Sequence, residues 1–68
     1  MDEKNLILEK VKKLLLNNII FLENKIIYRV KKVFDIFIIF NCVFVEIEGL
    51  KGEKVKINLN KICRIQKK

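Results

Sequence analysis

The chain of 68 residues contains no histidine, serine or threonine. Covalent catalysis uses a hydroxyl or thiol nucleophile beside a base such as histidine, and general acid–base chemistry needs two titratable partners. The isolated carboxylate Asp35 stands in an apolar stretch without such a partner. These absences predict a protein that is not an enzyme.

Cysteine is also scarce, because Cys42 and Cys63 are the two in the chain and form no CxxC motif. A structural zinc site needs four nitrogen or sulfur ligands, which two thiols without histidine cannot supply. We therefore expect no metal and no other cofactor. The cysteines form a disulfide if the fold brings them together, or else they are small buried residues of a reduced, intracellular protein.

Proline is absent, and glycine occurs only at positions 49 and 52. The chain therefore lacks a glycine-rich phosphate-binding loop, a linker and any repeat, and residues 1–68 are expected to form a single domain. A domain of this size buries only about 60% of its unfolded surface, so oligomerisation is the expected source of further stability. Because 51% of the residues are hydrophobic, we expect part of the apolar surface to lie between the subunits of a homo-oligomer.

No hydrophobic run reaches the length of a membrane-spanning helix. The longest, Val33 to Val45, has 13 residues and is interrupted by Asp35 and Asn41, whereas a spanning helix needs about 20 apolar residues. The first residues, Met1 to Asn5, lack the cationic region and the cleavage site of a secretory signal. The sequence therefore predicts a soluble, cytoplasmic protein with no membrane partner.

What the chain has in excess is positive charge. Its 15 basic and 8 acidic residues give a formal net charge of +7. Such an excess favours a polyanionic partner, above all nucleic acid. A plainer interpretation stays open, because 13 of the 15 cations are lysine, and lysine, isoleucine and asparagine make up 32 of the 68 residues. AT-rich coding produces that bias without selection for binding.

Residues 3–16 are predicted to form a helix. Asp2 is a suitable N-cap, and a lysine-rich end suits the negative pole of the helix dipole. Four apolar residues recur at helical spacing on one face, namely Ile7, Val11, Leu14 and Leu15. The pair Asn17-Asn18 is expected to end the helix.

Five antiparallel strands are expected after the helix. Four are short and cover residues 19–23, 43–48, 54–59 and 62–65, and one is long and bent and covers residues 26–40. The alternation slips at Lys31-Lys32, where a β-bulge would bend the long strand. Ile36 to Phe40 is so apolar that we expect cover on both of its faces. A sheet this small is expected to curl into a barrel over residues 19–66.

The best-formed predicted element is a hairpin with its turn at Gly49 to Gly52. Both glycines of the chain lie in this turn, where a positive φ angle costs least for glycine. Apolar residues alternate with polar ones on both strands. On the polar face, we expect cross-strand pairs between the acidic residues of the first strand and the basic residues of the second, which are Glu46, Glu48, Lys54 and Lys56.

Four blocks of the chain carry a resemblance to a known family. They are the pair Lys12-Lys13, the segment Ile20 to Lys25, the F-D-x-F block within Val33 to Phe40, and Leu59 to Ile62. In this order they are similar to the paired arginines, the I-Y-L-x-N-G motif, the F-D-Q-F block and the Y-K-H strand of the Sm-like family, most closely of its bacterial Hfq branch of RNA chaperones. The chain departs from that pattern at Asn58-Leu59-Asn60, where it has no Y-K-H.

The resemblance implies an α+β fold in which an N-terminal helix accompanies a strongly bent, five-stranded antiparallel small barrel of Sm-like or SH3-like type. It also implies assembly through strand edges into a ring or a dimer, and binding of single-stranded RNA. Phe37 would lie at a nucleotide pocket near a central pore, and Phe21 would lie on the opposite face. Lys12 and Lys13 would form a basic patch at the rim.

The residues themselves indicate a second set of RNA contacts. Basic side chains alternate with the aromatic residues Tyr28 and Phe34, an arrangement in which cations follow the phosphates while aromatic faces stack on bases. The basic members of this cluster are Lys25, Arg29, Lys31 and Lys32.

Ordinary structural roles compete with these functional roles. The lysines would then form solvated surfaces, and Tyr28, Phe21 and Phe37 would belong to the core. Two other functions also remain open for the chain: an SH3-like barrel that serves as a protein-interaction or structural module, and a small basic barrel that binds duplex DNA.

Overall fold

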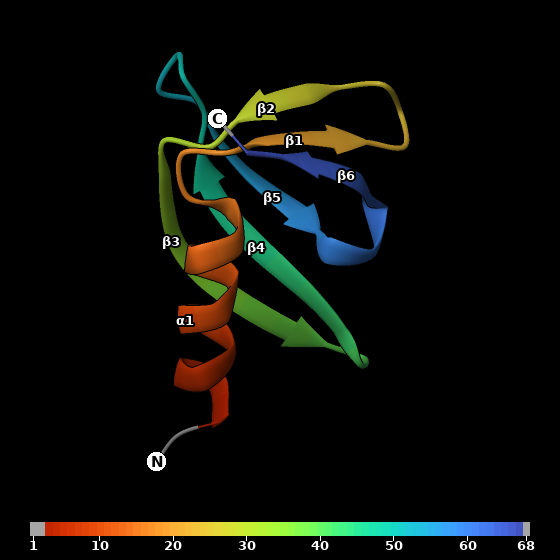
Figure 1. The fold of residues 1–68 in the computed structure, drawn as a ribbon. Helices are drawn as coiled ribbons and strands as arrows, with labels where there is room; N and C mark the ends of the chain where they lie inside the picture. The colour runs from red at the N-terminus through yellow and green to blue at the C-terminus, as the bar shows by residue number, and fades with distance from the viewer. Residues whose placement is uncertain (1–2, 68) are drawn as a thin grey trace.

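The computed structural model describes residues 3–67, which form one α-helix, six β-strands and a short 3-10 helix (Figure 1). The bounds in chain order are α1 (Glu3–Leu15), β1 (Ile19–Leu22), β2 (Ile27–Arg29), β3 (Lys32–Ile39), β4 (Cys42–Glu48), β5 (Lys54–Asn58), η1 (Leu59–Lys61) and β6 (Ile62–Gln66). The α+β class with an N-terminal helix is thus confirmed.

Helix α1 ends one residue before the predicted position. Val11 and Leu15 are buried on its inner face, as their helical spacing predicts. Asn17 adopts the left-handed conformation with φ +65°, and the Asn18 side chain donates a hydrogen bond of 2.6 Å to the carbonyl of Leu14. Asparagine tolerates the left-handed conformation, so this pair terminates the helix. The predicted cap Asp2 lies outside the described residues.

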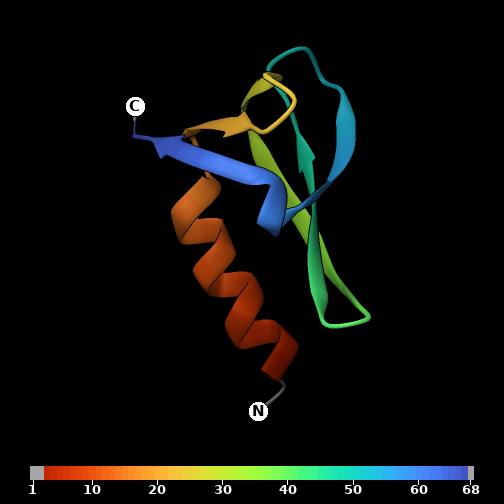
Figure 2. The same ribbon diagram turned by 90° about the vertical axis from the view of Figure 1, so that its right-hand side faces the viewer.

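The strands form two antiparallel sheets of three strands each, with the orders β2-β1-β6 and β3-β4-β5 (Figures 1 and 2). The predicted antiparallel strands are therefore present, but they are six in number and form two sheets and not one five-stranded barrel. The predicted long strand over residues 26–40 is divided into β2 and β3, and each half belongs to a different sheet.

The division falls at Val30 and Lys31, close to the predicted bulge at Lys31-Lys32. The Val30 backbone exchanges two hydrogen bonds of 2.9 Å with the segment after α1, because its N–H donates to the carbonyl of Asn18 and its carbonyl accepts from Asn17. The Lys31 N–H instead donates to the carbonyl of Glu48, at 2.8 Å. The chain therefore leaves the first sheet and enters the second within two residues.

One hydrophobic cluster connects the helix with both sheets. Its members from α1 are Val11 and Leu15, and those from the strand region are Ile20, Val30, Ile36, Val45, Ile47 and Ile57. Each is at most 5% exposed. Removal of such side chains from water is the main favourable contribution to folding. This shared cluster therefore fixes the position of the two sheets relative to each other and to α1.

The hairpin of β3 and β4 extends beyond the third strand of its sheet (Figure 1). Strand β5 pairs with β4 only from Phe44 to Glu48, so the end of the hairpin has no further strand beside it. Ile38 and Ile39 are about half exposed and Phe40 is 95% exposed. The prediction that Ile36 to Phe40 is covered on both faces is confirmed for Ile36, which is fully buried, but is wrong for Ile38 to Phe40, because β5 is too short to reach this end.

The β4–β5 hairpin has the predicted register, with Glu46 opposite Lys56 and Glu48 opposite Lys54. The ion pair of Glu48 is nevertheless with Lys31, whose Nζ lies 3.9 Å from Oε2. Gly52 has the positive φ of +83° that the turn was predicted to require.

Both cysteines are free thiols, with Cys42 half-buried and Cys63 exposed. The disulfide alternative is therefore wrong, and the other alternative is wrong about burial, because neither thiol is fully buried. Their strands belong to different sheets, since Cys42 begins β4 and Cys63 lies in β6. Within the part of the chain that the structure describes, no helix has the length and hydrophobicity to cross a bilayer.

Candidate nucleic-acid interface

The outer face of the first sheet combines an aromatic ring with arginines. Residues directly opposite each other in an antiparallel pair point to the same face. Ile20 is fully buried, so its neighbours in β1 point outward, and the register places their cross-strand partners beside them. We call this surface the Phe21 face, and it consists of Ile19, Phe21, Ile27, Arg29, Arg64 and Gln66.

Phe21 lies on the central strand between partners from both neighbours. Ile27 of β2 is opposite on one side and Arg64 of β6 on the other. The guanidinium carbon of Arg64 lies 5.2 Å from the centroid of the Phe21 ring, within the range of a cation–π contact. An Nη2 group of Arg64 also donates to Oε1 of Gln66 at 3.4 Å. The two strands thus hold a planar cation over an aromatic ring.

The Phe21 face itself contains two cations and no acid, and the charged residues Lys51 and Glu53 of the β4–β5 turn line a hollow beside Arg29. Arg29 and Arg64 are the two arginines of the sequence, and none of the six described residues of this face is acidic. A guanidinium offers a planar fork of donors that matches phosphate oxygens and also stacks on rings. Ile27, which is 56% exposed, adds apolar surface beside Phe21.

The outer face of the second sheet has rings and cations as well. We call it the Phe37 face. It consists of Phe37 and Phe44, which lie opposite each other, and of Lys32, Asp35, Glu46, Glu48, Lys54 and Lys56. The Nζ of Lys56 lies 4.6 Å from the centroid of Phe37, and that of Lys4 in α1 lies 5.9 Å away. Lys54 similarly lies 4.9 Å from the centroid of Phe34. Phe37 and Phe34 therefore each have at least one ammonium group near the ring.

Acidic residues compensate the lysines of the Phe37 face. One row across the three strands consists of Lys32, Glu48 and Lys54. The next row consists of Asp35, Glu46 and Lys56. Lys4 Nζ also lies 3.5 Å from Oδ1 of Asp35. Opposite charges on neighbouring strands attract one another, so this face presents little net charge to a phosphate.

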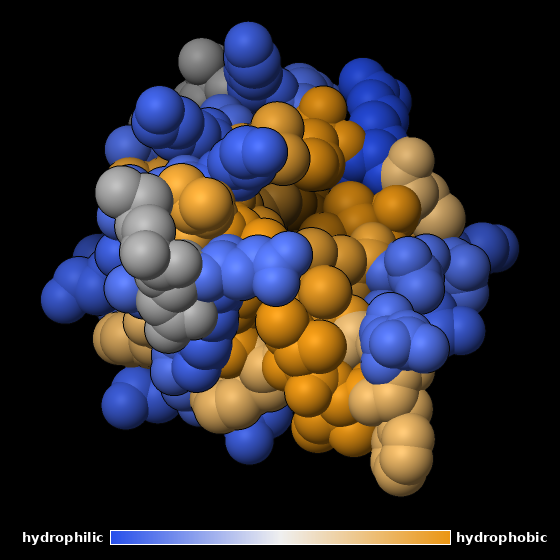
Figure 3. All heavy atoms as spheres, turned by 90° about the horizontal axis from the view of Figure 1, so that it is seen from below, coloured by the Kyte–Doolittle hydropathy of each residue, from blue (hydrophilic) through white to orange (hydrophobic). Residues whose placement is uncertain are grey.

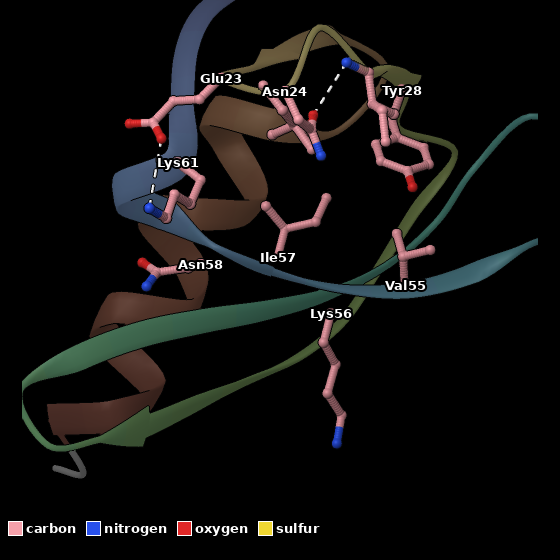
Figure 4. Close-up of a pocket in the computed structure, with 10 residues that line it drawn as sticks. Glu23, Asn24, Tyr28, Val55, Lys56, Ile57, Asn58 and Lys61 are labelled. Atoms are coloured by element: carbon pink, nitrogen blue, oxygen red, sulfur yellow. Dashed lines mark hydrogen bonds and ion pairs between the residues drawn. The ribbon is translucent and has the colours of Figure 1, made fainter.

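A groove of about 550 Å³ separates the β1–β2 turn from β5 and η1 (Figure 4). Ile57 and Val55 face it from β5, and Tyr28 lies across from them. Tyr28 is opposite the buried Ile20 and thus points to the inner side of its sheet. The side chain of Lys56 points away from the groove. The groove is therefore largely an apolar hollow with a polar end.

Backbone and side-chain contacts hold the polar end of this groove in place. Asn24 Oδ1 accepts a hydrogen bond of 3.1 Å from the N–H of Ile26, and Lys25 adopts a positive φ of +70° in the same turn. The Glu23 N–H donates to the carbonyl of Lys61 at 3.0 Å, and Lys61 Nζ lies 3.4 Å from Oε2 of Glu23. The ammonium group nearest the groove is therefore already paired.

The structure does not bring the predicted basic cluster together. Lys25 lies in the β1–β2 turn, Arg29 lies on the Phe21 face, and Lys32 lies on the Phe37 face. Lys31, between the sheets, pairs with Glu48, and Tyr28 points inward as its ordinary structural role predicts.

The remaining predicted residues lie on separate surfaces. Lys12 and Lys13 are in the last turn of α1, where Lys12 is half-buried and Lys13 is exposed. Phe21 and Phe37 are both half-buried, and they belong to the outer faces of different sheets. Of the predicted set, Phe21 shares one face with Arg29, and Phe37 shares the other with Lys32.

Arg64 is the contact that the sequence reasoning missed. It becomes a neighbour of Phe21 because β6 pairs with β1, two strands that are about 40 residues apart in the chain. The signal that could have found it is the rarity of arginine, since this chain has only two among its 15 cations. Local alternation alone contains no information about that pairing.

No family model, no curated protein and no solved structure matches this chain. We therefore infer its function from the geometry of the Phe21 face and from the contrast with the Phe37 face.

Proposed function

We propose that this protein binds single-stranded RNA without catalysis, as a homo-oligomer of Sm-like type, and that the Phe21 face is the contact surface. The observation that carries the proposal is the guanidinium of Arg64 at 5.2 Å from the Phe21 ring, on a face with both arginines and no acidic member among its described residues.

The proposed mechanism divides recognition between rings and cations. A base that has left its stack places its face on Phe21, which contributes about 1–3 kcal/mol per base. Arg29 and Arg64 hold the flanking phosphates through paired N–H donors. Because every base has an aromatic face, such a surface binds single strands with little sequence preference.

We assign the contact to the Phe21 face rather than to the groove beside Tyr28. Lys61, at the polar end of the groove, is paired with Glu23, and Lys56 points away from it. The Phe37 face is a weaker candidate because its lysines lie beside acidic residues. An uncompensated cation attracts a phosphate more strongly than one that already has a counter-charge.

Two features of the strand order support assembly through strand edges, as in the Sm-like family. The sheet β6-β1-β2 continues into the sheet β3-β4-β5 through the chain, because only two residues separate β2 from β3. Among the described residues, β5 pairs only with β4 and β6 pairs only with β1. Each therefore has one open edge, and an open edge is a template for pairing with another chain.

The test is fluorescence anisotropy with labelled U-rich RNA, A-rich RNA and duplex DNA at two salt concentrations, together with light scattering on the pure protein. If seven phosphates are neutralised, the log–log salt slope for single strands is about −5. Single-stranded RNA is expected to bind more tightly than duplex DNA. Equal binding of the duplex would support the basic DNA-binding barrel instead.

A protein-interaction module is the second candidate, because several large apolar side chains are more than a third exposed. They are Leu6, Leu14, Leu16, Ile26, Ile27, Phe34, Ile38, Ile39, Phe40, Leu50 and Ile65. Exposed apolar surface of this kind marks interaction sites in soluble proteins. A monodisperse monomer that binds none of the three probes would favour this candidate over RNA binding.

A further inference from the structure

A hollow of about 440 Å³ borders the Phe21 face along the open edge of β2. It lies between β2 and the β4–β5 turn, two segments that are close together in both ribbon views (Figures 1 and 2). Three members of the Phe21 face line it, namely Ile19, Ile27 and Arg29. The hollow is therefore continuous with the surface that we assign to RNA.

The opposite wall of the hollow comes from the β4–β5 turn. Leu50, which is 63% exposed, adds an aliphatic side chain, and Lys51 adds a cation. The carboxylate of Glu53 accepts a hydrogen bond of 3.0 Å from the N–H of Lys51, so this acid is held against its own turn. With Arg29 on the other wall, the lining has two cations and one acid. This balance favours a ligand with a phosphate.

The open edge of β2 also presents main-chain groups on this side. The carbonyl of Ile26 accepts a hydrogen bond from β1, and the N–H of Val30 donates one to the residue before β1, both at 2.9 Å. Bonded positions alternate in an antiparallel pair, so Ile27 and Arg29 direct their N–H and carbonyl groups away from β1. No described strand pairs with them there, because β2 is an outer strand of its sheet.

We propose that this hollow receives the base next to the one on Phe21 in a bound single strand of RNA. The inference rests on the proposed function and deepens it by a second base site. Arg29 belongs both to the Phe21 face and to the hollow, so its guanidinium holds the phosphate that joins the two nucleotides. The base packs between Ile27 and Leu50, and its edge bonds to the main-chain groups of β2.

The two base sites are close enough for neighbouring nucleotides. Ile27 lies directly opposite Phe21, and neighbouring strands in a sheet are about 4.8 Å apart. The hollow begins at the far side of β2, which places it roughly 10 Å from the strand of Phe21, two strand spacings away.

The edge of an unpaired base provides the hydrogen bonds that the open strand edge lacks. Each residue on the open side of β2 has one main-chain donor and one acceptor, and unpaired bases carry donors and acceptors on their Watson–Crick edges. In a duplex those groups are already paired. The second site therefore favours single strands over duplexes. It also makes binding depend on the base edge, which stacking on Phe21 alone does not.

Other occupants fit this hollow less well. A peptide that adds a strand to β2 would find only three residues to pair with, although main-chain hydrogen bonds supply the affinity of that mode. A purely aliphatic ligand would bury Arg29 and Lys51 without a counter-charge, which is costly. The apolar surface at the opposite end of the molecule (Figure 3) suits such a ligand better.

The decisive experiment uses labelled RNA oligomers with uracils at chosen positions of an otherwise abasic backbone, and binding is measured by anisotropy. Two adjacent uracils are expected to bind wild type at least about fivefold more tightly than a single uracil, the lower end of the contribution of one further base. With one base site, the second uracil would add only the statistical factor of about two.

Two variants separate the hollow from a general effect of charge. Leu50→Glu places a carboxylate in the hollow and is expected to reduce the gain from the second uracil to the statistical factor. Leu14→Glu makes the same change at a 57% exposed position of α1 outside the hollow and is expected to keep the full gain. Because both positions are exposed, both variants are expected to melt like wild type.

A modified base tests the contact with the main chain. N3-methyluracil keeps the ring for stacking but lacks the donor on the Watson–Crick edge, so two adjacent N3-methyluracils are expected to show no gain over one. In a two-dimensional amide NMR spectrum, the N–H signals of Ile27 and Arg29 are expected to shift with the two-uracil oligomer and not with the methylated one.

The possible failures are distinguishable. A gain limited to the statistical factor in wild type, or equal gains in Leu50→Glu and Leu14→Glu, would overturn the second site and leave the single site on Phe21 in place. An unchanged gain with N3-methyluracil would overturn the main-chain contact. If wild type binds neither these oligomers nor unmodified single-stranded RNA, the proposed function fails, and the second site fails with it.

Discussion

The outer faces of the two sheets have the same components but different electrostatics. Each consists of three antiparallel strands with a half-buried phenylalanine and a cation over its ring, at 5.2 Å for Arg64 on Phe21 and 4.6 Å for Lys56 on Phe37. On the Phe37 face, acidic residues occur in the same cross-strand rows as the lysines. The six residues of the Phe21 face include no acid.

Because both faces have a cation above a ring, this contact alone does not distinguish one face from the other as a nucleic-acid site. Such contacts stabilise a folded sheet by about 0.5–1 kcal/mol at exposed sites, so they occur for structural reasons too. The two faces differ in net charge, which is the sum of the charges of all residues on each face. A net positive charge attracts a phosphate backbone.

Charge reversal is expected to give the largest effect. The double variant Arg29→Glu/Arg64→Glu should weaken binding of single-stranded RNA by more than about 100-fold, because each hydrogen bond to a charged group contributes about 1.5–3 kcal/mol. The matched double variant Lys54→Glu/Lys56→Glu on the Phe37 face should lose less than about tenfold. Anisotropy titrations measure both, and equal losses would mean that only total charge matters.

Removal of the aromatic rings is expected to have the next largest effect. Phe21→Leu keeps an apolar side chain in place but loses the stacking surface, so binding should weaken by about 5- to 150-fold, the equivalent of 1–3 kcal/mol. Phe37→Leu should stay within about twofold of wild type. If Phe37→Leu were the more damaging change, the assignment would move to the second sheet.

A smaller effect concerns the turn of the first sheet. Lys25 has a φ of +70°, so Lys25→Gly should raise the free energy of unfolding by about 1 kcal/mol and Tm by about 4–8 °C. Lys51→Gly removes the same charge at a position without a positive φ and should give no gain. Urea denaturation of the two variants checks this, and equal changes would remove the conformational explanation.

The smallest effect separates the shape of the cation from its charge. Arg64→Lys keeps the charge but loses the planar fork, so affinity should fall about threefold, the order of one hydrogen bond, with an unchanged salt slope. Lys56→Arg on the Phe37 face should leave affinity within about twofold. A shallower salt slope for Arg64→Lys would instead mean that a phosphate contact had been lost.

Elements that depend on neighbouring residues were predictable from the sequence. The helix was predicted over residues 3–16 and is observed at Glu3–Leu15, since its burial pattern is repeated every three or four residues. The β4–β5 hairpin was predicted with the observed register, because one short turn with a glycine at positive φ determines it.

Predictions that required distant parts of the chain to meet were less successful. The predicted basic cluster is dispersed, because alternate side chains point to opposite faces and the chain changes sheets at Val30. The end of the predicted covered segment, Ile38 to Phe40, is exposed, because β5 ends before it. Of the candidate site, Phe21 and Arg29 were predictable, whereas their combination with Arg64 was not.

The sequence by itself determined the α+β class, the helix, the position of the turns and the excess of positive charge, because each of these follows from composition or from residues close together in the chain. Only the tertiary structure decided which cations share a sheet face with acidic residues and which do not. That outcome depends on the pairing of β1 with β6 and on the division of the bent strand between two sheets. The free energy for both comes from burial of one shared core, which no local pattern specifies.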